Sequence, residues 1–334
     1  MRFGIMDHVD DAGVPAWEQY ETRLKLIEAA ERLGFYSYHV AEHHGTPLGR
    51  APSPSVYLAA VAQRTTRLKF GPMVFVAPLY HPMRLAEEIC MLDQLSRGRL
   101  QLGIGRGAVW PEQELYDVDP AGAAERYAEA RDIVLQALAS QRVSFTGKHF
   151  RVRDFPMVLK PFQRPRPPLW YGIGNPDSAV WAAAESANVV SLMPAALARR
   201  VLDRYREEWA KLGRAASELP FLGLARHIVV AATDEQARGI ARAAFPRWRR
   251  SFSALWDERG IPFPMDFPWE WDELESRRLA IAGAPHTVRE YLSAQREEAR
   301  ATFFLCQMIF GDISYENALR SLSLFAEDVA PAFA

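Results

Sequence analysis

Residues 68–105 read LKFGPMVFVAPLYHPMRLAEEICMLDQLSRGRLQLGIG and contain a strand, a helix and a second strand. Segment 68–78 is almost wholly apolar, which is typical of a parallel strand that is buried on both faces. The helix that begins at Pro82 repeats apolar residues on one face, namely Leu85, Ile89, Leu92 and Leu95. The second strand covers 99–105, so the stretch predicts one βαβ unit of a parallel sheet.

The same alternation extends in both directions and occurs about eight times. The expected strands are 2–6, 35–42, 68–78, 99–105, 168–174, 188–193, 221–231 and 301–310. The expected helices are 16–33, 54–65, 82–95, 120–139, 176–187, 195–212, 234–245 and 314–329. Eight alternations predict an α/β fold of the (β/α)8 TIM barrel type rather than an open sheet, with residues 1–334 forming a single domain.

Two stretches depart from this repeat and are predicted to be insertions. Residues 141–168 have a turn at Thr146-Gly147 and five prolines, so we expect a hairpin and an extended connection over the barrel mouth or rim. Residues 247–284 contain four tryptophans, and a long aromatic insertion of this kind is typical of a lid or binding element.

Composition excludes several classes of function. Lys and Arg total 40 against 41 for Asp and Glu, and no long block of one sign is present to attract nucleic acid or an anionic membrane. The two cysteines, Cys90 and Cys306, form no CxxC pair and no disulfide framework. No export signal and no apolar run long enough to span a membrane is visible, so we expect a cytoplasmic protein.

Glu42, His43 and His44 directly follow the second expected strand. In a TIM barrel the catalytic groups lie at the carboxyl ends of the strands, so these side chains should project into the barrel mouth. A neutral imidazole can accept or donate a proton near pH 7. The segment is therefore the first candidate for catalysis.

Three segments, in the same order along the chain, resemble segments of the bacterial luciferase-like family of flavin-dependent oxidoreductases. They are EHH at 42–44, the long segment HPMRLAEEICMLDQLSRGRLQLGIGRG at 81–107, and SLSLFAEDVAPAF at 321–333. The long segment is the most specific of the three. The EHH and C-terminal segments are closer to the branch that uses flavin mononucleotide (FMN) than to the branch that uses a deazaflavin coenzyme.

The resemblance implies a flavin site at the ends of the third to fifth strands. Met73 and Val74 match the position of a non-prolyl cis peptide that supports the flavin ring. Gly105 and Arg106 match further flavin-contacting positions, where glycine allows close approach and arginine offers a permanent cation.

The resemblance also implies which residues bind the flavin phosphate and which residue is the catalytic base. Gly174, Asn175 and Ser178 match positions that hold the flavin phosphate, and we expect free N–H groups at the start of the helix from Pro176 to bind it. By the same matching, His43 is the catalytic base, and Glu42 and His44 support its tautomer and orientation. In the family this imidazole aids formation or decay of a flavin C4a-peroxide.

The resemblance also implies the partners. We expect reduced FMN, supplied by a separate flavin reductase, to react with O2 and oxidise a small, apolar organic substrate. Family members pair through their second and third helices, and the segments 57–65 and 85–95 are apolar enough for a homodimer.

Other interpretations remain open at this point. They are a deazaflavin-dependent oxidoreductase of the same fold, a flavin-binding protein without turnover, and a metal-dependent barrel hydrolase with Asp7, His8, Glu42, His43 and His44 as ligands. The segment GIGRGA at 103–108 fits a dinucleotide-binding pattern, but Trp110-Pro111 should interrupt the helix that this pattern requires.

Overall fold

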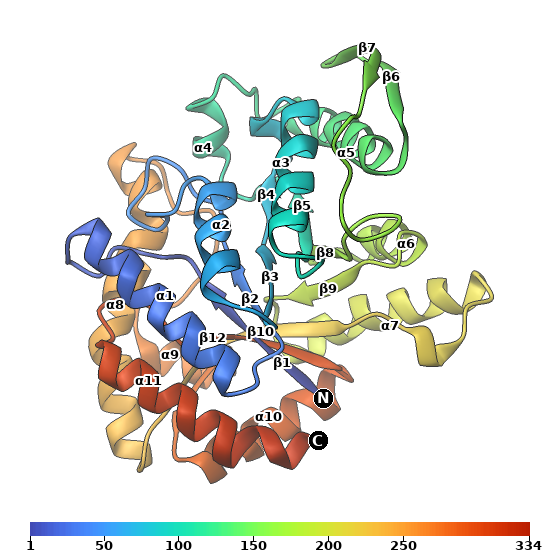
Figure 1. Ribbon diagram of the computed structural model, residues 1–334. Helices are drawn as coiled ribbons and strands as arrows, with labels where there is room; N and C mark the ends of the chain where they lie inside the picture. Colours follow the sequence, from blue (N-terminus) through green and yellow to red (C-terminus); the bar gives the residue numbers. More distant parts are fainter.

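The computed structural model describes residues 1–334 and contains a ring of parallel strands surrounded by helices (Figure 1). The strand order is β3–β2–β1–β12–β10–β9–β8–β5–β4. The ring closes because β4 pairs with β5 and Phe70 in β3 bridges to Leu100. The ring strands are β1 (Arg2–Asp7), β2 (Ser37–Val40), β3 (Lys69–Pro72), β4 (Phe75–Val76), β5 (Leu102–Gly105), β8 (Leu169–Gly172), β9 (Asn188–Ser191), β10 (Leu222–Val230) and β12 (Phe303–Gln307). The predicted (β/α)8 TIM barrel is confirmed.

The helices form the outer layer of this barrel. Prolines stand in the first turns of α2, α3 and α6, where the missing N–H costs nothing, as the sequence predicted. The helices are α1 (Ala16–Arg32), α2 (Pro54–Arg64), α3 (Pro82–Leu95), α4 (Trp110–Glu114), α5 (Ala123–Ala139), α6 (Pro176–Ala184), α7 (Ala195–Lys211), α8 (Asp234–Glu258), α9 (Trp271–Ser276), α10 (Pro285–Ala299) and α11 (Tyr315–Leu324). None of them is both long enough and apolar enough to cross a membrane.

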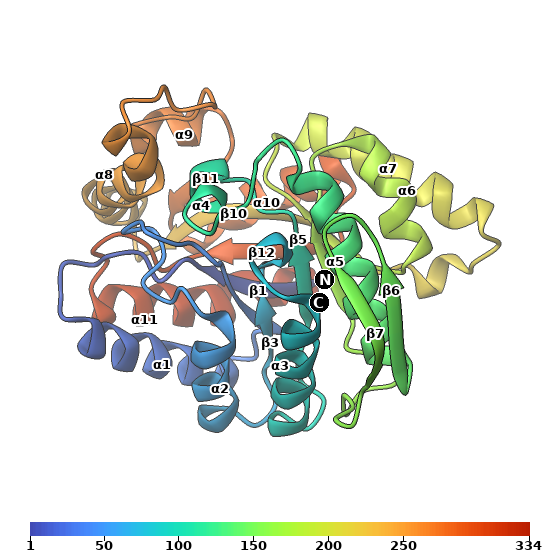
Figure 2. The same cartoon turned by 90° about the horizontal axis from the view of Figure 1, so that it is seen from above.

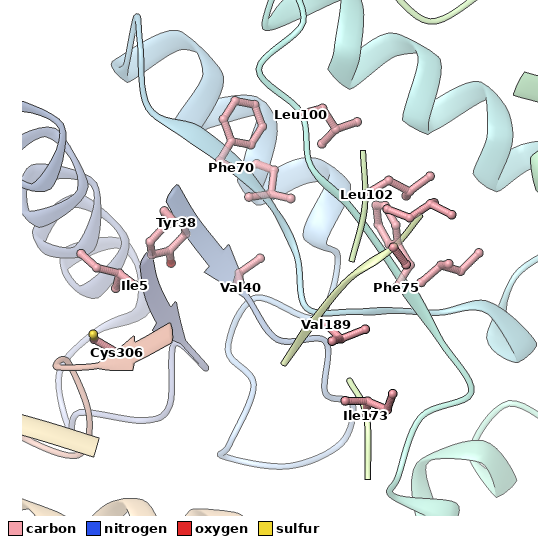
Figure 3. Close-up of a cluster of buried hydrophobic side chains, with 14 of the residues drawn as sticks. Ile5, Tyr38, Val40, Phe70, Phe75, Leu100, Leu102, Ile173, Val189 and Cys306 are labelled. Carbon is pink, nitrogen blue, oxygen red and sulfur yellow. The ribbon is translucent and has the colours of Figure 1, made fainter. Parts of the chain in front are cut away.

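Side chains of the strands and of the covering helices form a core cluster of 69 buried residues. Figure 3 shows part of it, with Ile5, Tyr38 and Phe70 on successive strands of the ring. Both cysteines are free and fully buried in this core. Burial raises the pKa of the Cys90 thiol to about 11 and raises that of Cys306 further.

The expected strand 68–78 is divided into β3 and β4, and the Met73–Val74 peptide bond between them is cis, as the resemblance implied. Two glycines of β5 face this junction. A Cβ atom at Gly103 would lie 2.1 Å from the Pro72 carbonyl oxygen, and one at Gly105 would lie 2.6 Å from Val74 Cγ2. At Gly103 only glycine fits, because the two backbones approach each other there, whereas at Gly105 the Val74 side chain fills the space.

The insertion at 141–168 forms the predicted hairpin, from β6 (Arg142–Thr146) and β7 (Arg151–Pro156), and only its tip lies at the expected rim of the barrel. Figure 2 shows the hairpin beside α5 on the outside of the barrel. Glu129 of α5 accepts hydrogen bonds from the backbone N–H groups of residues 148–150. Gln163 then bonds Asp93 near the end of α3. Helices run opposite to the strands, so Gln163 and the extended connection lie at the amino end of the barrel. The hairpin tip lies beside the first turn of α5, where Lys148 forms an ion pair with Glu125, on the carboxyl-end side of the flank.

The insertion at 247–284 begins as a continuation of α8, so the expected end of that helix at residue 245 was wrong. Pro246 lies inside the helix, and the apolar face continues past it with Trp248 and Leu255, which keeps the helix packed to Glu258. The insertion then contains α9 and the short strand β11 (Ala280–Gly283), which pairs with the end of β10. The sequence did not predict β11, because AIAG is short and rich in Ala and Gly.

Candidate active site

Polar side chains from several strands gather at the carboxyl end of the barrel. His8 follows β1, the Glu42–His44 segment follows β2, and Gln307 ends β12. The insertion at 247–284 covers this end of the barrel. Thr46 Oγ1 donates to the Ser251 carbonyl oxygen 3.2 Å away, and Arg259 forms an ion pair with Glu114. The expected location of His43 at the mouth is thus observed, and residues 247–284 lie where a lid would, while the functional roles of both stay predictions.

His43 is held by a carboxylate that the sequence analysis did not identify. Its Nδ1 atom lies 2.8 Å from Oε1 of Glu112, and the two side chains are 15% and 4% exposed. A carboxylate accepts hydrogen bonds, so Nδ1 carries the proton and donates it, while Nε2 keeps its lone pair. Glu112 lies in α4, whose first turn contains Pro111. Pro111 therefore stands in the first turn of a short helix that begins at Trp110. No helix opens at the glycines of 103–108, so the helix that the dinucleotide-binding pattern requires is not formed, as expected.

Glu42 and His44 interact with one another rather than with His43. Glu42 Oε1 accepts from His44 Nε2 at 2.8 Å, and its Oε2 accepts from the backbone N–H of Val76 at 2.9 Å. Tyr116 Oη lies 2.8 Å from His44 Nδ1. Both nitrogens of His44 are therefore occupied, and Glu42 joins the end of β2 to β4. The expected support of the His43 tautomer by these two residues is replaced by the Glu112 contact.

A second imidazole, His8, lies beside His43, and a third, His227, lies close to His8. The ring centroids of His8 and His43 are 5.5 Å apart with an interplanar angle of 22°, and His227 of β10 packs against Trp248 at 4.6 Å. Gln307 Nε2 lies 3.0 Å from His8 Nδ1. Burial lowers the pKa of His227 to about 3 and holds that of His8 well below its ordinary value, so both rings are neutral at pH 7.

The residues expected to contact a flavin ring lie at the ends of neighbouring strands. Met73 and Val74 are half-buried between β3 and β4, and Gly105 ends β5 next to Val74. The backbone carbonyl oxygen of Arg106 accepts from Gln113 Nε2 at 3.1 Å. Its guanidinium group is exposed and forms no ion pair, so the cation is free to bind an anion.

The residues expected to hold a phosphate follow β8, which pairs with β5. Asn175 Oδ1 accepts from the backbone N–H of Asp177 at 2.9 Å, and the Asn175 carbonyl oxygen accepts from that of Ser178 at 3.1 Å. Asn175 therefore caps this helix before Pro176, as expected, and its side-chain and carbonyl oxygens bind the N–H groups of Asp177 and Ser178, so these two N–H groups are not free. The Asn175 amide nitrogen, the Ser178 hydroxyl and Arg106 remain as donors. A Cβ at Gly174 would meet no atom within 4 Å, so the space beside this residue is open and leaves room for a ligand group.

The metal-site interpretation does not find its ligands in this arrangement. No three His, Cys, Asp or Glu side chains are placed to hold a metal ion. Asp7 instead accepts from the Tyr38 hydroxyl at 3.0 Å and lies 3.4 Å from Arg23. His43 and His44 already bind the carboxylates of Glu112 and Glu42.

Comparison with known proteins places this site in a family. Residues 1–302 match the family model described as luciferase-like monooxygenase. The chain is 45% identical over 319 residues to protein y4wF of Sinorhizobium fredii, covering 96% of this chain and 93% of the relative. It is 26% identical to the oxygenase component of the flavin-dependent trigonelline monooxygenase of Acinetobacter baylyi, covering 100% and 96% of the two chains.

Solved structures show the same fold. Monooxygenase RslO1 of Streptomyces bottropensis aligns with a TM-score of 0.90 at 26% identity and full coverage of both chains. The oxygenating constituent of 3,6-diketocamphane monooxygenase of Pseudomonas putida, in complex with FMN, aligns with a TM-score of 0.78 at 23% identity, covering 99% and 98%. A coenzyme F420-dependent tetrahydromethanopterin reductase of Methanopyrus kandleri aligns with a TM-score of 0.74 at 19% identity, covering 100% and 99%.

The barrel and the match to monooxygenases along the chain therefore define a TIM-barrel oxidoreductase. The chain belongs to the luciferase-like monooxygenase family, and this membership supports a flavin-type cofactor.

Proposed function

We propose that this protein is an FMN-dependent monooxygenase that oxidises a small organic substrate with O2. The observation that carries the proposal is the His43–Glu112 pair, which leaves His43 Nε2 free at the carboxyl end of the barrel. Free donors for a phosphate lie two and three strands away around the ring, at the ends of β5 and β8. The oxygenase names of several relatives add support.

The structure suggests how each part of FMN is held. Met73, Val74 and Gly105 would support the flavin ring, because they lie together at the ends of neighbouring strands, where Gly105 packs directly against Val74. Arg106, Asn175 and Ser178 would bind the phosphate, with Gly174 leaving space for it. Reduced FMN, when bound, supplies the electrons with which one oxygen atom of O2 enters the substrate and the other leaves as water.

His43 handles the proton in this proposal. Glu112 fixes the proton on Nδ1, so Nε2 can accept a proton from the reacting groups and return it. The segment formed by α8 and α9 covers the same end of the barrel and limits access of water.

A separate flavin reductase is proposed as the source of reduced FMN. The trigonelline relative is named as an oxygenase component, which supports a two-component arrangement for this chain as well. The deazaflavin alternative is less well supported, since the coenzyme F420-dependent neighbour shares only 19% identity.

Binding of FMN tests the cofactor assignment. We expect fluorescence titration to show that Arg106→Ala weakens FMN binding about ten- to a hundredfold, because a charge-assisted contact of about 1.5 to 3 kcal/mol is lost. Riboflavin, which lacks the phosphate, is the matched control and should bind the wild type and the variant equally. Equal loss for both flavins would place the phosphate elsewhere, and tighter binding of coenzyme F420 than of FMN would favour the deazaflavin alternative.

The reaction itself is tested with a supplied flavin reductase and ¹⁸O2. Aldehydes, alkanes and aromatic compounds are screened for substrate-dependent O2 consumption, and products are analysed by mass spectrometry. We expect incorporation of one labelled oxygen atom. Oxidised product without label would contradict a monooxygenase.

A further inference from the structure

His8 and His43 present opposite hydrogen-bonding groups at the carboxyl end of the barrel. Their rings lie nearly parallel, with centroids 5.5 Å apart, on the adjacent strand ends of β1 and β2. Both Nδ1 atoms are bound within the chain. Neither Nε2 atom has a partner, and neither is among the fully buried unpaired atoms, so both remain accessible.

The two Nδ1 contacts set the tautomers in opposite senses. Glu112 can only accept, so His43 has its proton on Nδ1 and a lone pair on Nε2. The Gln307 amide nitrogen can only donate, so His8 accepts at Nδ1 and carries its proton on Nε2. His8 stays neutral, because burial and the neighbouring rings of His43 and His227 lower its pKa.

We propose that His8 and His43 form a donor–acceptor pair that recognises a hydroxyl group of the substrate. The hydroxyl oxygen accepts from Nε2–H of His8, and the hydroxyl proton is donated to Nε2 of His43. Two hydrogen bonds of about 2.8 Å that meet at one oxygen place their two nitrogen atoms roughly 4.5 to 5 Å apart. The ring centroids of His8 and His43 are 5.5 Å apart, so one hydroxyl oxygen can lie close to both rings. This inference rests on the proposed function and narrows its substrate class to compounds that carry a hydroxyl group.

Two neighbouring side chains hold the His8 ring in place. Trp248 packs edge-on against it with centroids 5.6 Å apart, and Gln307 holds Nδ1.

A methoxy compound has no proton to donate to His43 and carries a methyl group in its place. The pair should therefore discriminate between a hydroxyl compound and its methyl ether.

Calorimetry tests this preference with two matched pairs of probes, 4-ethylphenol with 4-ethylanisole and cyclohexanol with methoxycyclohexane. The binding of each is measured without FMN and again with FMN present. We expect the hydroxyl compound to bind about tenfold more tightly in at least one pair, which corresponds to one hydrogen bond of about 1.4 kcal/mol. The absence of a preference in both pairs would overturn the proposal.

Two variants assign the preference to His8. His8→Phe keeps the ring but removes the donor, and it should abolish the preference, whereas His8→Gln keeps an N–H donor and should retain part of it. A preference that persists in His8→Phe would also overturn the proposal. FMN titration of the same proteins separates this test from that of the proposed function, because hydroxyl selectivity in the absence of FMN does not depend on the cofactor.

Discussion

His43 is the residue on which the proposed chemistry depends most directly. We predict that His43→Ala slows turnover by at least about a hundredfold while FMN binding is unchanged, because general acid–base assistance typically contributes about 10² to 10⁴ in rate. Stopped-flow mixing of the reduced-flavin enzyme with O2 and substrate measures this effect. Unchanged flavin reoxidation and product yield would make His43 a structural residue.

A substitution of Glu112 tests whether the tautomer of His43 matters for turnover. Glu112→Gln keeps the size of the side chain but lets an amide donate to His43 Nδ1, which moves the ring proton to Nε2. We expect a loss of at least about 100-fold, comparable to that of His43→Ala, because Nε2 then carries a proton and cannot accept another. His44→Ala should cost less turnover, because its nitrogens bind Glu42 and Tyr116.

At the residue scale, the sequence identified site residues that directly follow a strand. It did not identify their hydrogen-bond partners, which come from distant parts of the chain. His43 could be predicted because it follows a strand of a recognisable barrel. Glu112 could not, because it is 69 residues further along the chain in a segment expected to be irregular. The pairing of His8 with Gln307 spans 299 residues and has no local signal.

At the scale of elements, the junction of β4 and β5 makes a prediction about stability. Gly105→Ala would place a Cβ atom 2.6 Å from Val74 Cγ2, and overpacking of this kind costs about 1 to 3 kcal/mol. Urea denaturation should show this loss, and adding Val74→Ala should restore most of it. Gly103→Ala is the contrasting case, because its Cβ would meet the backbone oxygen of Pro72 and no side-chain truncation can relieve the clash. If Val74→Ala rescued both variants equally, this explanation would fail.

Elements with a continuous apolar face were predicted closely, and α3 was predicted at residues 82–95, the bounds it has in the structure. Errors arose where long-range packing overrides a local signal. Pro246 predicts a helix end, but aromatic packing between Phe245, Trp248 and Trp271 holds α8 together across it. The hairpin was identified from its turn, but its position depends on Glu129, and nothing in the local sequence specifies that contact.

At the scale of the whole molecule, the expected homodimer can be tested through α2 and α3. Val56, Met91 and Leu95 are large apolar side chains that are 74%, 54% and 48% exposed on these packed helices. We predict that the protein is a dimer by light scattering and that Val56→Glu with Met91→Glu makes it a monomer. Trp17→Glu on α1, which replaces an equally exposed apolar residue, is the control and should leave the dimer intact. A monomeric wild type would contradict the prediction.

Acid sensitivity is a second property of the whole molecule. Burial lowers the pKa of His39 and of His227 to about 3, whereas both are near 6.5 in the unfolded chain. Below pH 6.5 only the unfolded state takes up these protons, so each histidine lowers the free energy of unfolding by about 1.4 kcal/mol per pH unit down to about pH 3. Asp10 acts in the opposite sense, because burial raises its pKa to about 7.

A difference measurement isolates the histidine contribution to acid sensitivity. His39→Asn should make the free energy of unfolding less dependent on pH by about 1.4 kcal/mol per pH unit between pH 6 and 4. Urea denaturation across this range measures it. An equal slope in wild type and variant would show that His39 titrates normally in the folded protein.

The burial of Cys90 and Cys306 has a practical consequence for spectroscopy. Thiol-reactive dyes need an accessible thiolate, and both thiols are fully buried with raised pKa values. We therefore expect neither thiol of the folded protein to react with maleimides. A single cysteine introduced in the exposed loop 259–270 could be labelled selectively without removing either natural cysteine, and its fluorescence would follow the covering segment directly as ligands bind.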